Sequence, residues 1–166
     1  MKSILSLILI LSSFTVFAKT YDLDEAKVFK FLTIAGQPSK RTIDSVKEQN
    51  FDIVINLRSP KEFDEFDEKS YVESKGLKYV NIPFFDKNKK IGQKNIDRIT
   101  SFVEKNKKKK IFIHCSSGNR VAAWLLIHFN KDHNMSVAKA LKVSKEMGLN
   151  KTEMEVKVLD FIKSTN

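Results

Sequence analysis

Short apolar runs alternate with segments of helical pattern through most of this 166-residue sequence. The runs are rich in aliphatic and β-branched residues, as buried strands are, and the segments between them carry helix signals or repeat apolar residues every three or four positions. This alternation predicts a parallel sheet joined by right-handed helical crossovers. Because the length suits one domain, we expect a single α/β domain with a central, mainly parallel sheet flanked by helices.

Turn and cap residues set the boundaries of the expected elements. Ser39 can cap a helix, Ser59 and Pro60 form a good helix entry, and Gly76 is a good helix end. The segment "VAAWLLIHFN" (121–130) is apolar nearly all round, which predicts a buried helix. The expected strands are 28–36, 51–57, 77–83 and 110–114. The expected helices are 40–50, the segment between Ser59 and Gly76, 93–106, 121–130, 136–147 and 151–163.

Residues 1–18, "MKSILSLILILSSFTVFA", have the pattern of a secretory signal peptide. One lysine precedes an apolar stretch, and small residues mark a cleavage site. The apolar stretch is too short for a comfortable transmembrane helix, although an uncleaved anchor is the alternative. We therefore expect a periplasmic or secreted protein whose folded domain spans 19–166, with no stable membrane insertion after cleavage.

The mature chain is expected to be basic. Loss of Lys2 with the signal peptide leaves 29 Lys and Arg against 20 Asp and Glu, a net charge of +9. A basic surface attracts nucleic acid, anionic membranes or phosphorylated molecules. The excess is diffuse and no nucleic-acid-binding module is recognisable, so we expect no nucleic-acid partner. A phosphorylated substrate, either a small molecule or a phosphoprotein, fits the charge better.

The chain has a single cysteine, Cys115, in the stretch "IFIHCSSGNR". One cysteine forms no intrachain disulfide, and a free thiol is an oxidation hazard in an exported protein, which mildly favours a chemical role. Cys115 follows the expected strand 110–114 and precedes a helix. In parallel sheets, ligands bind beyond the carboxyl ends of strands. The competing interpretation is that Cys115 is a small buried apolar residue.

The residues around Cys115 have the composition of an anion-binding loop. The amides of a loop that enters a helix N-terminus point inward, and the helix dipole favours negative charge there. Gly118 permits a backbone that closes such a loop, and Arg120 offers a planar fork for two anion oxygens. The same positive field favours the thiolate of Cys115, the form that acts as a nucleophile. The expected substrate-binding residues are His114, Ser116, Ser117, Gly118 and Asn119, beside the catalytic Cys115 and Arg120.

This stretch resembles the loops of two superfamilies. Cysteine-dependent phosphatases of the protein tyrosine and dual-specificity type carry His-Cys, five residues and Arg, whereas rhodanese sulfurtransferases carry Cys, four residues and Arg. Four residues separate Cys115 from Arg120 here, and "VINLRSPKEFDE" is also similar to a rhodanese stretch. A narrower family that the chain resembles, the phosphatase-like domain of beta-lactamase-hydrolase-like proteins, also has the four-residue loop. The matching stretches are "IAGQPS" (34–39), "FDIVINLRSPKEF" (51–63), "GLKYVNIPF" (76–84), "HCSSGNRVAAW" (114–124) and "SKEMGL" (144–149).

The resemblance implies the dual-specificity phosphatase fold and a phosphatase acting on a phosphomonoester without metal or cofactor. It also implies a general acid on a loop after the preceding strand, a place that Asp86 occupies in "NIPFFDKN". Phosphatases commonly carry Ser or Thr directly after the arginine, where this chain has Val121. Ser116 or Ser117 would then have to help release the thiolate.

Two alternatives stay open from the residues alone. In a sulfurtransferase, Cys115 would carry a persulfide and Asp86 would be unnecessary. In a non-catalytic module, the loop would bind phosphate without turning it over.

Four further residues have expected roles near or away from the loop. Arg58 and Glu62 are expected near one sheet edge, where they either brace Arg120 or form a surface salt bridge. His128 lies in the buried helix and His133 in a turn, and neither has a metal-ligand partner at useful spacing. We therefore expect both histidines to be structural and expect no metal site.

Overall fold

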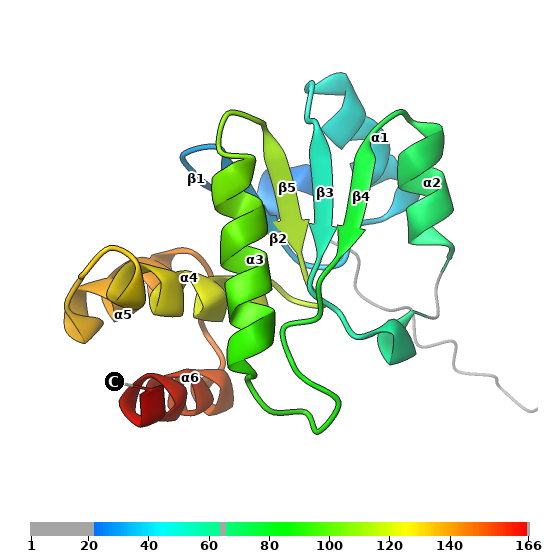
Figure 1. Cartoon of the computed structure of the whole chain (residues 1–166). Coiled ribbons are helices and arrows are strands. Elements are labelled where there is room, and N and C mark those ends of the chain that lie inside the picture. The colour runs from blue at the N-terminus through cyan, green and yellow to red at the C-terminus, as the bar shows by residue number, and fades with distance from the viewer. Residues whose placement is uncertain (1–21, 64–65, 166) are drawn as a thin grey trace, which may run out of the picture.

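The computed structural model describes residues 22–63 and 66–165, so the expected signal peptide lies outside the described residues. These residues form a five-stranded sheet in the order β1-β2-β5-β3-β4, in which only β1 runs antiparallel to its neighbour (Figure 1). The strands are β1 (Lys27–Phe29), β2 (Leu32–Ala35), β3 (Ile53–Asn56), β4 (Lys78–Asn81) and β5 (Ile111–His114). The expected mainly parallel α/β architecture is confirmed.

Within residues 22–63 and 66–165, six α-helices and two short 3-10 helices accompany the sheet. The α-helices are α1 (Lys40–Glu48), α2 (Glu68–Ser74), α3 (Gln93–Lys105), α4 (Asn119–Lys131), α5 (Val137–Glu146) and α6 (Thr152–Thr165). The 3-10 helices are η1 (Leu23–Glu25) and η2 (Pro60–Glu62). Among the described residues, no helix combines the length and apolar character needed to cross a bilayer.

The single strand expected over 28–36 is a hairpin, and this prediction was wrong. β1 and β2 pair antiparallel, with Phe29 opposite Leu32, and Lys30 takes a left-handed backbone conformation (φ 54°) in the turn between them. Lysine is an unusual residue for that conformation, and the turn carries neither glycine nor asparagine. The continuous apolar run therefore concealed the chain reversal.

The prediction of a single helix between Ser59 and Gly76 was also wrong, because the α-helix begins later than Ser59. Ser59 caps η2 and forms a capping box with Glu62, but this turn ends at Phe63. α2 begins later, where the side chain of Asp67 accepts a hydrogen bond from the amide of Ser70. The cap residue was recognised correctly, but the length of the helix it starts was not.

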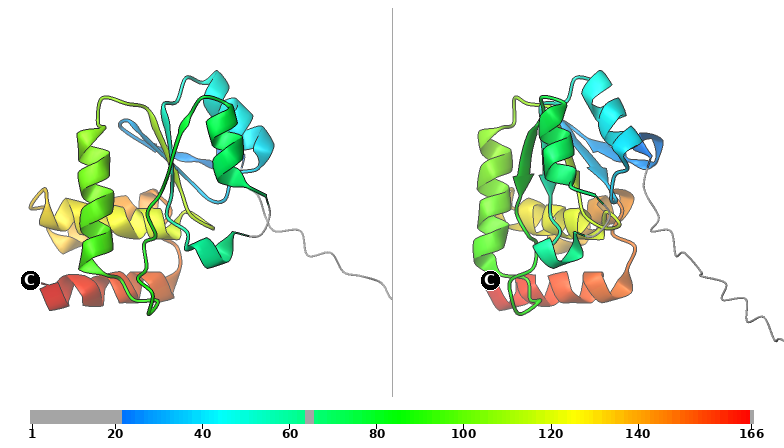
Figure 2. Two further views of the ribbon diagram at one scale, coloured as in Figure 1. Left: turned by 45° about the vertical axis from the view of Figure 1, so that its right-hand side comes forward. Right: turned by 90° about the vertical axis from the view of Figure 1, so that its right-hand side faces the viewer.

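Each strand sends alternate residues to opposite faces of the sheet, as a two-residue period requires. Ile53 and Ile55 join the core beneath α3 and α4, whereas Val54 joins the core beneath α1 and α2. Figure 2 shows the helices distributed around the sheet, and α5 and α6 pack on α4 rather than on the sheet. Helices on both faces leave the carboxyl ends of the central strands as one rim, where the site forms.

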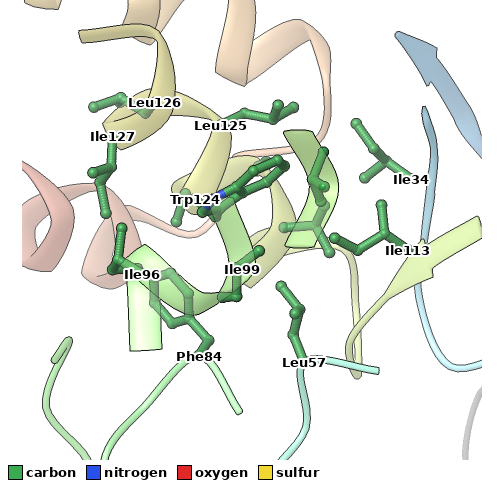
Figure 3. Packing of buried hydrophobic residues seen from close by; sticks show 14 of the residues in the cluster. Ile34, Leu57, Phe84, Ile96, Ile99, Ile113, Trp124, Leu125, Leu126 and Ile127 are labelled. Atoms are coloured by element: carbon green, nitrogen blue, oxygen red, sulfur yellow. The ribbon is translucent and has the colours of Figure 1, made fainter. Parts of the chain in front are cut away.

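α4 is buried along nearly its whole length, as its apolar sequence predicts. Trp124 lies at the centre of the larger core, among Ile96 and Ile99 of α3 (Figure 3). Its indole nitrogen donates a hydrogen bond of 3.1 Å to the hydroxyl of Thr100, which satisfies its polar atom. Because α4 packs against other elements along nearly its whole length, the position of the loop at its N-terminus is fixed by the core.

Candidate active site

The loop after β5 is fastened to the chain that follows β2. The amide of Cys115 donates to the carbonyl of Ala35 (3.4 Å), and the amide of Gln37 donates to the carbonyl of Ser116 (3.2 Å). Ser117 and Gly36 form an isolated antiparallel bridge. The "GQ" residues therefore hold the Cys115 loop in place, which gives a structural reason for two of the residues that carried the family resemblance.

Gly118 joins this loop to α4 in a left-handed conformation with φ of 80°. A side chain there would be strained, because non-glycine residues rarely adopt this region. The turn places Asn119 and Arg120 in the first turn of the helix. The loop from Cys115 to Arg120 thus enters a helix N-terminus, as the sequence predicts.

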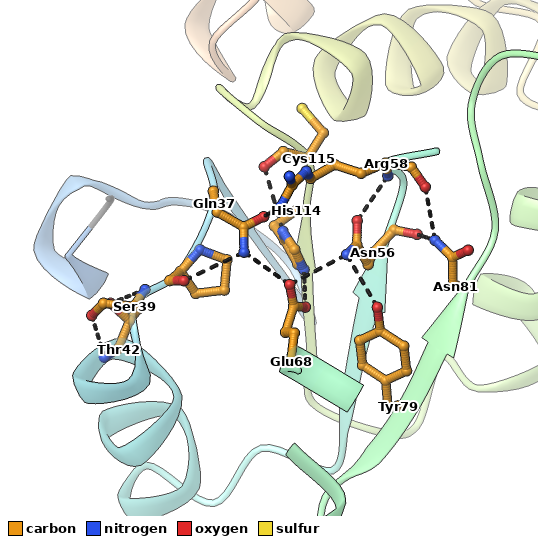
Figure 4. A network of polar contacts seen from close by, with 11 residues as sticks. Gln37, Ser39, Thr42, Asn56, Arg58, Glu68, Tyr79, Asn81, His114 and Cys115 are labelled. Atoms are coloured by element: carbon orange, nitrogen blue, oxygen red, sulfur yellow. Dashed lines mark hydrogen bonds and ion pairs between the residues drawn. The ribbon is translucent and has the colours of Figure 1, made fainter. Parts of the chain in front are cut away.

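Cys115 is free of any disulfide and only 1% exposed. Figure 4 shows its sulfur pointing away from the polar network below it. The residue is buried, and it begins the loop that enters the N-terminus of α4. Its role as a nucleophile stays a prediction. The Arg120 side chain lies near enough to Cys115 for the two to interact, and this interaction is among the causes that raise the pKa of Arg120.

Arg120 is fixed by a two-pronged ion pair with Glu62. Its two terminal nitrogens lie 2.8 and 2.7 Å from the two carboxylate oxygens of Glu62. Burial disfavours the guanidinium charge, but hydrogen bonds to Glu62 and the negative charge of Cys115 outweigh it and raise the pKa of Arg120. The expectation that Glu62 braces Arg120 is confirmed, and the brace presents a planar fork of fixed orientation.

Glu62 is itself held by the turn that bears it. The amide of Ser59 donates to Glu62 Oε1 over 2.9 Å, which closes the capping box of η2. Burial alone raises the pKa of Glu62, but the hydrogen bond from Arg120 and the amide of Ser59 reverse the effect and lower it. The 3-10 turn that replaced the start of the expected long helix therefore positions the carboxylate that orients Arg120.

His114 lies at the centre of a buried polar network beneath the loop (Figure 4). Its Nε2 is 2.7 Å from Glu68 Oε1, and its Nδ1 is 3.4 Å from the carbonyl of Cys115. Glu68 Oε2 accepts hydrogen bonds from the side-chain amides of Gln37 (2.8 Å) and Asn56 (3.3 Å). His114 therefore connects an anchored carboxylate to the backbone of Cys115, and its expected substrate-binding role stays a prediction.

The charge of Glu68 is stabilised despite its burial. Burial raises the pKa of a carboxyl, but His114, Gln37 and the charge of Arg58 together lower the pKa of Glu68 below its usual range. On the other side of the network, burial and the nearby Glu68 charge raise the pKa of Tyr79 to about 12. Its hydroxyl accepts a hydrogen bond of 3.1 Å from Asn56.

The sequence did not predict this network. Gln37 lay within a quoted stretch, but Glu68, Asn56 and Tyr79 had no pattern that set them apart from ordinary helix and strand residues. Among the described residues, no hydrogen bond or ion pair joins Arg58 to Arg120. The amide of Arg58 donates to Asn56 Oδ1 (2.7 Å), and its side chain donates to Gln37. The register of β3 against β5 places Asn56 opposite His114, and the other members come from α2, β4 and the chain after β2, so the network forms only in the fold.

Asn119 uses its side chain to join α4 to the start of α6. Its Oδ1 accepts hydrogen bonds from the amides of Asn150 (3.0 Å) and Lys151 (2.9 Å), and its Nδ2 donates to Asn150 Oδ1 (2.9 Å). Ser116 is exposed and Ser117 half-buried. The substrate-binding roles of Ser116, Ser117, Gly118 and Asn119 stay predictions, and for Asn119 only the backbone amide suits that role.

Asp86 lies on the loop between β4 and α3, where it shapes the loop. Its Oδ1 accepts hydrogen bonds from the amides of Asn88 (2.8 Å) and Lys90 (3.0 Å). None of the hydrogen bonds and ion pairs found among the described residues joins Asp86 to Cys115 or Arg120. The structure thus brings Cys115, Arg120 and His114 together, and the acid role of Asp86 stays a prediction.

A cavity of about 370 Å³ lies beside the network. Arg58, Glu68 and Tyr79 contribute from the network, and Phe63 and Phe66 supply apolar surface. The Arg58 guanidinium lies 5.7 Å from the centre of the Phe63 ring. The cavity combines two cationic side chains, Arg58 and Lys69, with aromatic walls.

Spacing along the sequence gives His128 and His133 no metal-ligand partner, but the fold places one beside them. The fold brings the end of α3 beside the end of α4, and one ligand atom each from Glu104, His128 and His133 lies within 4.8 Å of the others. Spacing along the sequence could not show this, because Glu104 comes from a different helix. These residues could hold a metal ion and lie at the end of α4 opposite Cys115.

Comparison with known proteins agrees with this architecture. Residues 33–155 match the model of the dual specificity phosphatase catalytic domain. Among curated proteins, none matches the sequence significantly.

Solved structures show the same fold at low sequence identity. A candidate phosphatase (DUF442) from Shewanella putrefaciens CN-32 is 20% identical, with a TM-score of 0.67 over 87% of this chain and 89% of its own. Tk-PTP in its active form is 22% identical, with a TM-score of 0.67 over 84% and 96%. Kinase associated phosphatase is 9% identical, with a TM-score of 0.71 over 88% and 97%. With the family match over most of the chain, the protein belongs to the dual-specificity phosphatases, within the cysteine-dependent superfamily that includes the protein tyrosine phosphatases.

Proposed function

We propose that this protein is an exported, cysteine-dependent phosphatase that hydrolyses a phosphomonoester through a phosphocysteine intermediate. The observation that carries the proposal is the arrangement at the rim of the sheet. A lone cysteine lies at the mouth of a helix N-terminus, near an arginine that Glu62 holds in a fixed orientation. The Shewanella and kinase-associated relatives carry the word phosphatase in their descriptions, and the latter has a catalytic-site cysteine.

The proposed reaction has two displacements at phosphorus. The Cys115 thiolate attacks in line, the S–P bond forms, and the bond from phosphorus to the leaving oxygen breaks. Arg120 and the loop amides hold the non-bridging oxygens, whose charge they stabilise throughout. A carboxylic acid, in our proposal Asp86, gives its proton to the leaving oxygen. Water then attacks phosphorus, its proton returns to that carboxylate, and inorganic phosphate leaves as the thiolate reforms.

His114 and Glu68 act as positioning residues in this scheme. Their ion pair lies under the loop and reaches the carbonyl of Cys115, so it fixes the backbone that presents the thiol. Val121 follows Arg120 and offers no hydroxyl to the leaving thiolate. Ser116 or Ser117 would serve instead, so we expect the second displacement to limit the rate.

One assay set tests the reaction type. Wild type, Cys115→Ser and Asp86→Asn are compared for hydrolysis of aryl phosphates and for sulfur transfer from thiosulfate to cyanide. We expect phosphate release that Cys115→Ser abolishes, and no sulfur transfer. Sulfur transfer without phosphate release would establish the sulfurtransferase, and phosphate binding without either turnover would establish a binding module.

The acid role of Asp86 is tested by comparing substrates whose leaving groups differ in how much they need a proton. Asparagine keeps the oxygen that accepts from the amides of Asn88 and Lys90, so the loop keeps its shape, but it has no proton to give. General acids typically contribute about 10²- to 10⁴-fold. We expect Asp86→Asn to lower kcat/KM, which reports the first displacement alone, by about 10²-fold or more for alkyl phosphates and much less for nitrophenyl phosphate. An equal effect on both would assign the acid to another residue.

Export rests on residues 1–18 and is tested separately. We expect the mature protein, recovered after expression in its own or a related cell, to begin at Lys19. An intact Met1 terminus in the cytoplasmic fraction would contradict export and leave the proposed reaction untouched.

A further inference from the structure

At the end of α4 remote from Cys115, three side chains converge in an arrangement that the proposed reaction does not use. Glu104 lies in the last turn of α3, His128 in the last turn of α4, and His133 just after α4. His128 Nε2 is 3.5 Å from Glu104 Oε1 and 3.1 Å from His133 Nε2. His128 stands eight residues beyond Arg120, or about 12 Å along the helix axis.

These separations match the edges of a tetrahedral metal site. Zn²⁺ binds imidazole nitrogen and carboxylate oxygen at about 2.0–2.2 Å with tetrahedral geometry, which sets neighbouring ligand atoms about 3.3 Å apart. The two contacts of His128 Nε2 fall on either side of that value. Two histidines and one carboxylate are also a known ligand set for zinc, with a fourth position left for water.

The ligand-bearing nitrogen of His128 is set by its other ring nitrogen. Nδ1 lies 2.8 Å from Asp132 Oδ2, so Nδ1 carries the proton and donates it to that carboxylate. A histidine held by a carboxylate in this way has its Nε2 lone pair free and more basic, as metal-ligating histidines usually do. Asp132 is therefore placed as a supporting residue for a metal on Nε2.

When Nδ1 carries the only ring proton of His128, direct hydrogen bonds do not meet both contacts of its Nε2. The Nε2 lone pair of His128 faces a carboxylate oxygen of Glu104, and both are acceptors. His133 can donate one proton to His128, but that satisfies only one of the two contacts. A divalent cation between the three atoms accepts all three lone pairs at once.

The surrounding contacts hold the rings while leaving the site open. The ring of His128 stacks on Trp124 with centroids 5.2 Å apart and an angle of 13°, and His133 meets it nearly at right angles. Glu104, His128 and His133 line a cavity of about 200 Å³, and His133 is exposed. Lys107 lies 3.8 Å from the other oxygen of Glu104, which leaves Oε1 for the site but weakens its attraction for a cation.

We propose that Glu104, His128 and His133 bind one divalent transition-metal ion of the zinc class, which fastens the ends of α3 and α4 together. The ion stabilises the fold at a distance from the reaction and takes no part in it. The proposal is independent of the phosphatase reaction and survives if that reaction is not found.

The test uses the tag-free mature protein, stripped with a chelator, and Zn²⁺ alone as the probe. The chain has three histidines, of which His114 is buried in the Cys115 network, so no other histidine pair competes. We expect one Zn²⁺ per chain by titration calorimetry and a higher melting temperature in its presence. His133→Ala, an exposed position, and Glu104→Gln each lower the affinity by more than about tenfold, and Asp132→Asn lowers it by about 10- to 100-fold.

Two controls separate this site from other zinc binding. Cys115→Ser removes the thiol, which also binds zinc, and must keep the one-to-one stoichiometry. Glu48→Gln, an exposed carboxyl at the end of α1, must keep wild-type affinity. Absence of one-to-one binding, binding that depends on Cys115, or binding that His133→Ala and Glu104→Gln leave unchanged each overturns the proposal.

Discussion

The two ends of α4 differ in how their charges are paired. At the N-terminal end, Arg120 is paired with Glu62, and His114 with Glu68, through short direct contacts. At the C-terminal end, His128 Nε2 lies 3.5 Å from a carboxylate oxygen and 3.1 Å from another imidazole nitrogen, and a single ring nitrogen makes a direct hydrogen bond with only one of them at a time. One end is electrostatically complete before any ligand arrives, and the other is not.

This difference suits the two proposed sites. The reaction site at Arg120 must bind and release a phosphate group, whereas the metal site at His128 must keep its ion. In the proposed reaction, Arg120 exchanges part of its interaction with Glu62 for one with phosphate and recovers it afterwards, which suits turnover. A histidine and carboxylate cluster without internal compensation gains most from a cation that stays. The same rigid helix carries both, and its buried side chains keep the two ends fixed relative to each other.

Replacing Arg120 by lysine is expected to have the largest effect at the N-terminal end. Lysine keeps the charge but lacks the planar fork that meets Glu62 and phosphate oxygens in pairs. We expect kcat/KM for aryl phosphate to fall by about 10³-fold with a small change in stability. Steady-state kinetics and a urea melt measure both, and a loss below tenfold would remove Arg120 from transition-state binding.

Breaking the His114 pair is expected to cost stability. Glu68→Gln leaves a buried histidine without its anion, a change that typically costs about 3 kcal/mol, or roughly 10²-fold in the unfolding equilibrium. Chemical denaturation at pH 7 measures the difference. Glu73→Gln, an exposed position on the same helix, is the matched control and should change stability by less than about 0.5 kcal/mol.

Glu68→Gln also tests how the contribution of Glu68 to the free energy of unfolding depends on pH. Because the folded-state pKa of Glu68 lies below its ordinary value of about 4.3, its stabilising contribution is complete above that value and is lost as pH falls through the folded-state pKa. The stability gap between wild type and Glu68→Gln should therefore shrink as pH drops below about 4. A gap that widens in acid would show that Glu68 is not held as a carboxylate.

Loosening the brace on Arg120 is expected to have a smaller effect. Glu62→Gln keeps one acceptor oxygen and the contact with the amide of Ser59, but removes the charge and one prong of the pair. We expect kcat/KM to fall by about tenfold and inhibition by inorganic phosphate to weaken. Unchanged kinetics would mean that the loop alone orients Arg120.

Substitutions at the C-terminal end of α4 should hardly change the rate of the reaction. His133→Ala removes a proposed metal ligand without touching the core of α4, so aryl phosphate turnover at 25 °C should stay within about twofold of wild type. The melting temperature should still lose its response to Zn²⁺. A large loss of turnover would show that the two ends of the helix are coupled.

The sequence predicted what depends on local pattern. Alternating strands and helices, the buried character of α4 and the position of Cys115 after a strand all follow from periodicity and turn residues. Glycine at 118 and serine at 39 were also interpretable, because a left-handed turn and a helix cap each require few residue types. These features needed no knowledge of which segments pair in space.

What the sequence missed depends on contacts between distant segments. The partner of His114 is Glu68, on a helix whose start was misplaced, and nothing in its neighbours marks it. Glu104 joins His128 only because α3 lies beside α4. The hairpin at Lys30 was missed for a different reason. Apolar residues flank its turn on both sides, and the turn contains neither glycine nor proline.

The most direct test of the central proposal is to trap the intermediate on Cys115. Wild-type protein is mixed with an aryl phosphate labelled on phosphorus, quenched in acid during turnover, digested and mapped by mass spectrometry. We predict label on the peptide that contains Cys115, approaching one per chain if the second displacement is slow, and none in Cys115→Ser. Phosphate release at the wild-type rate with no label on that peptide would contradict a phosphocysteine intermediate.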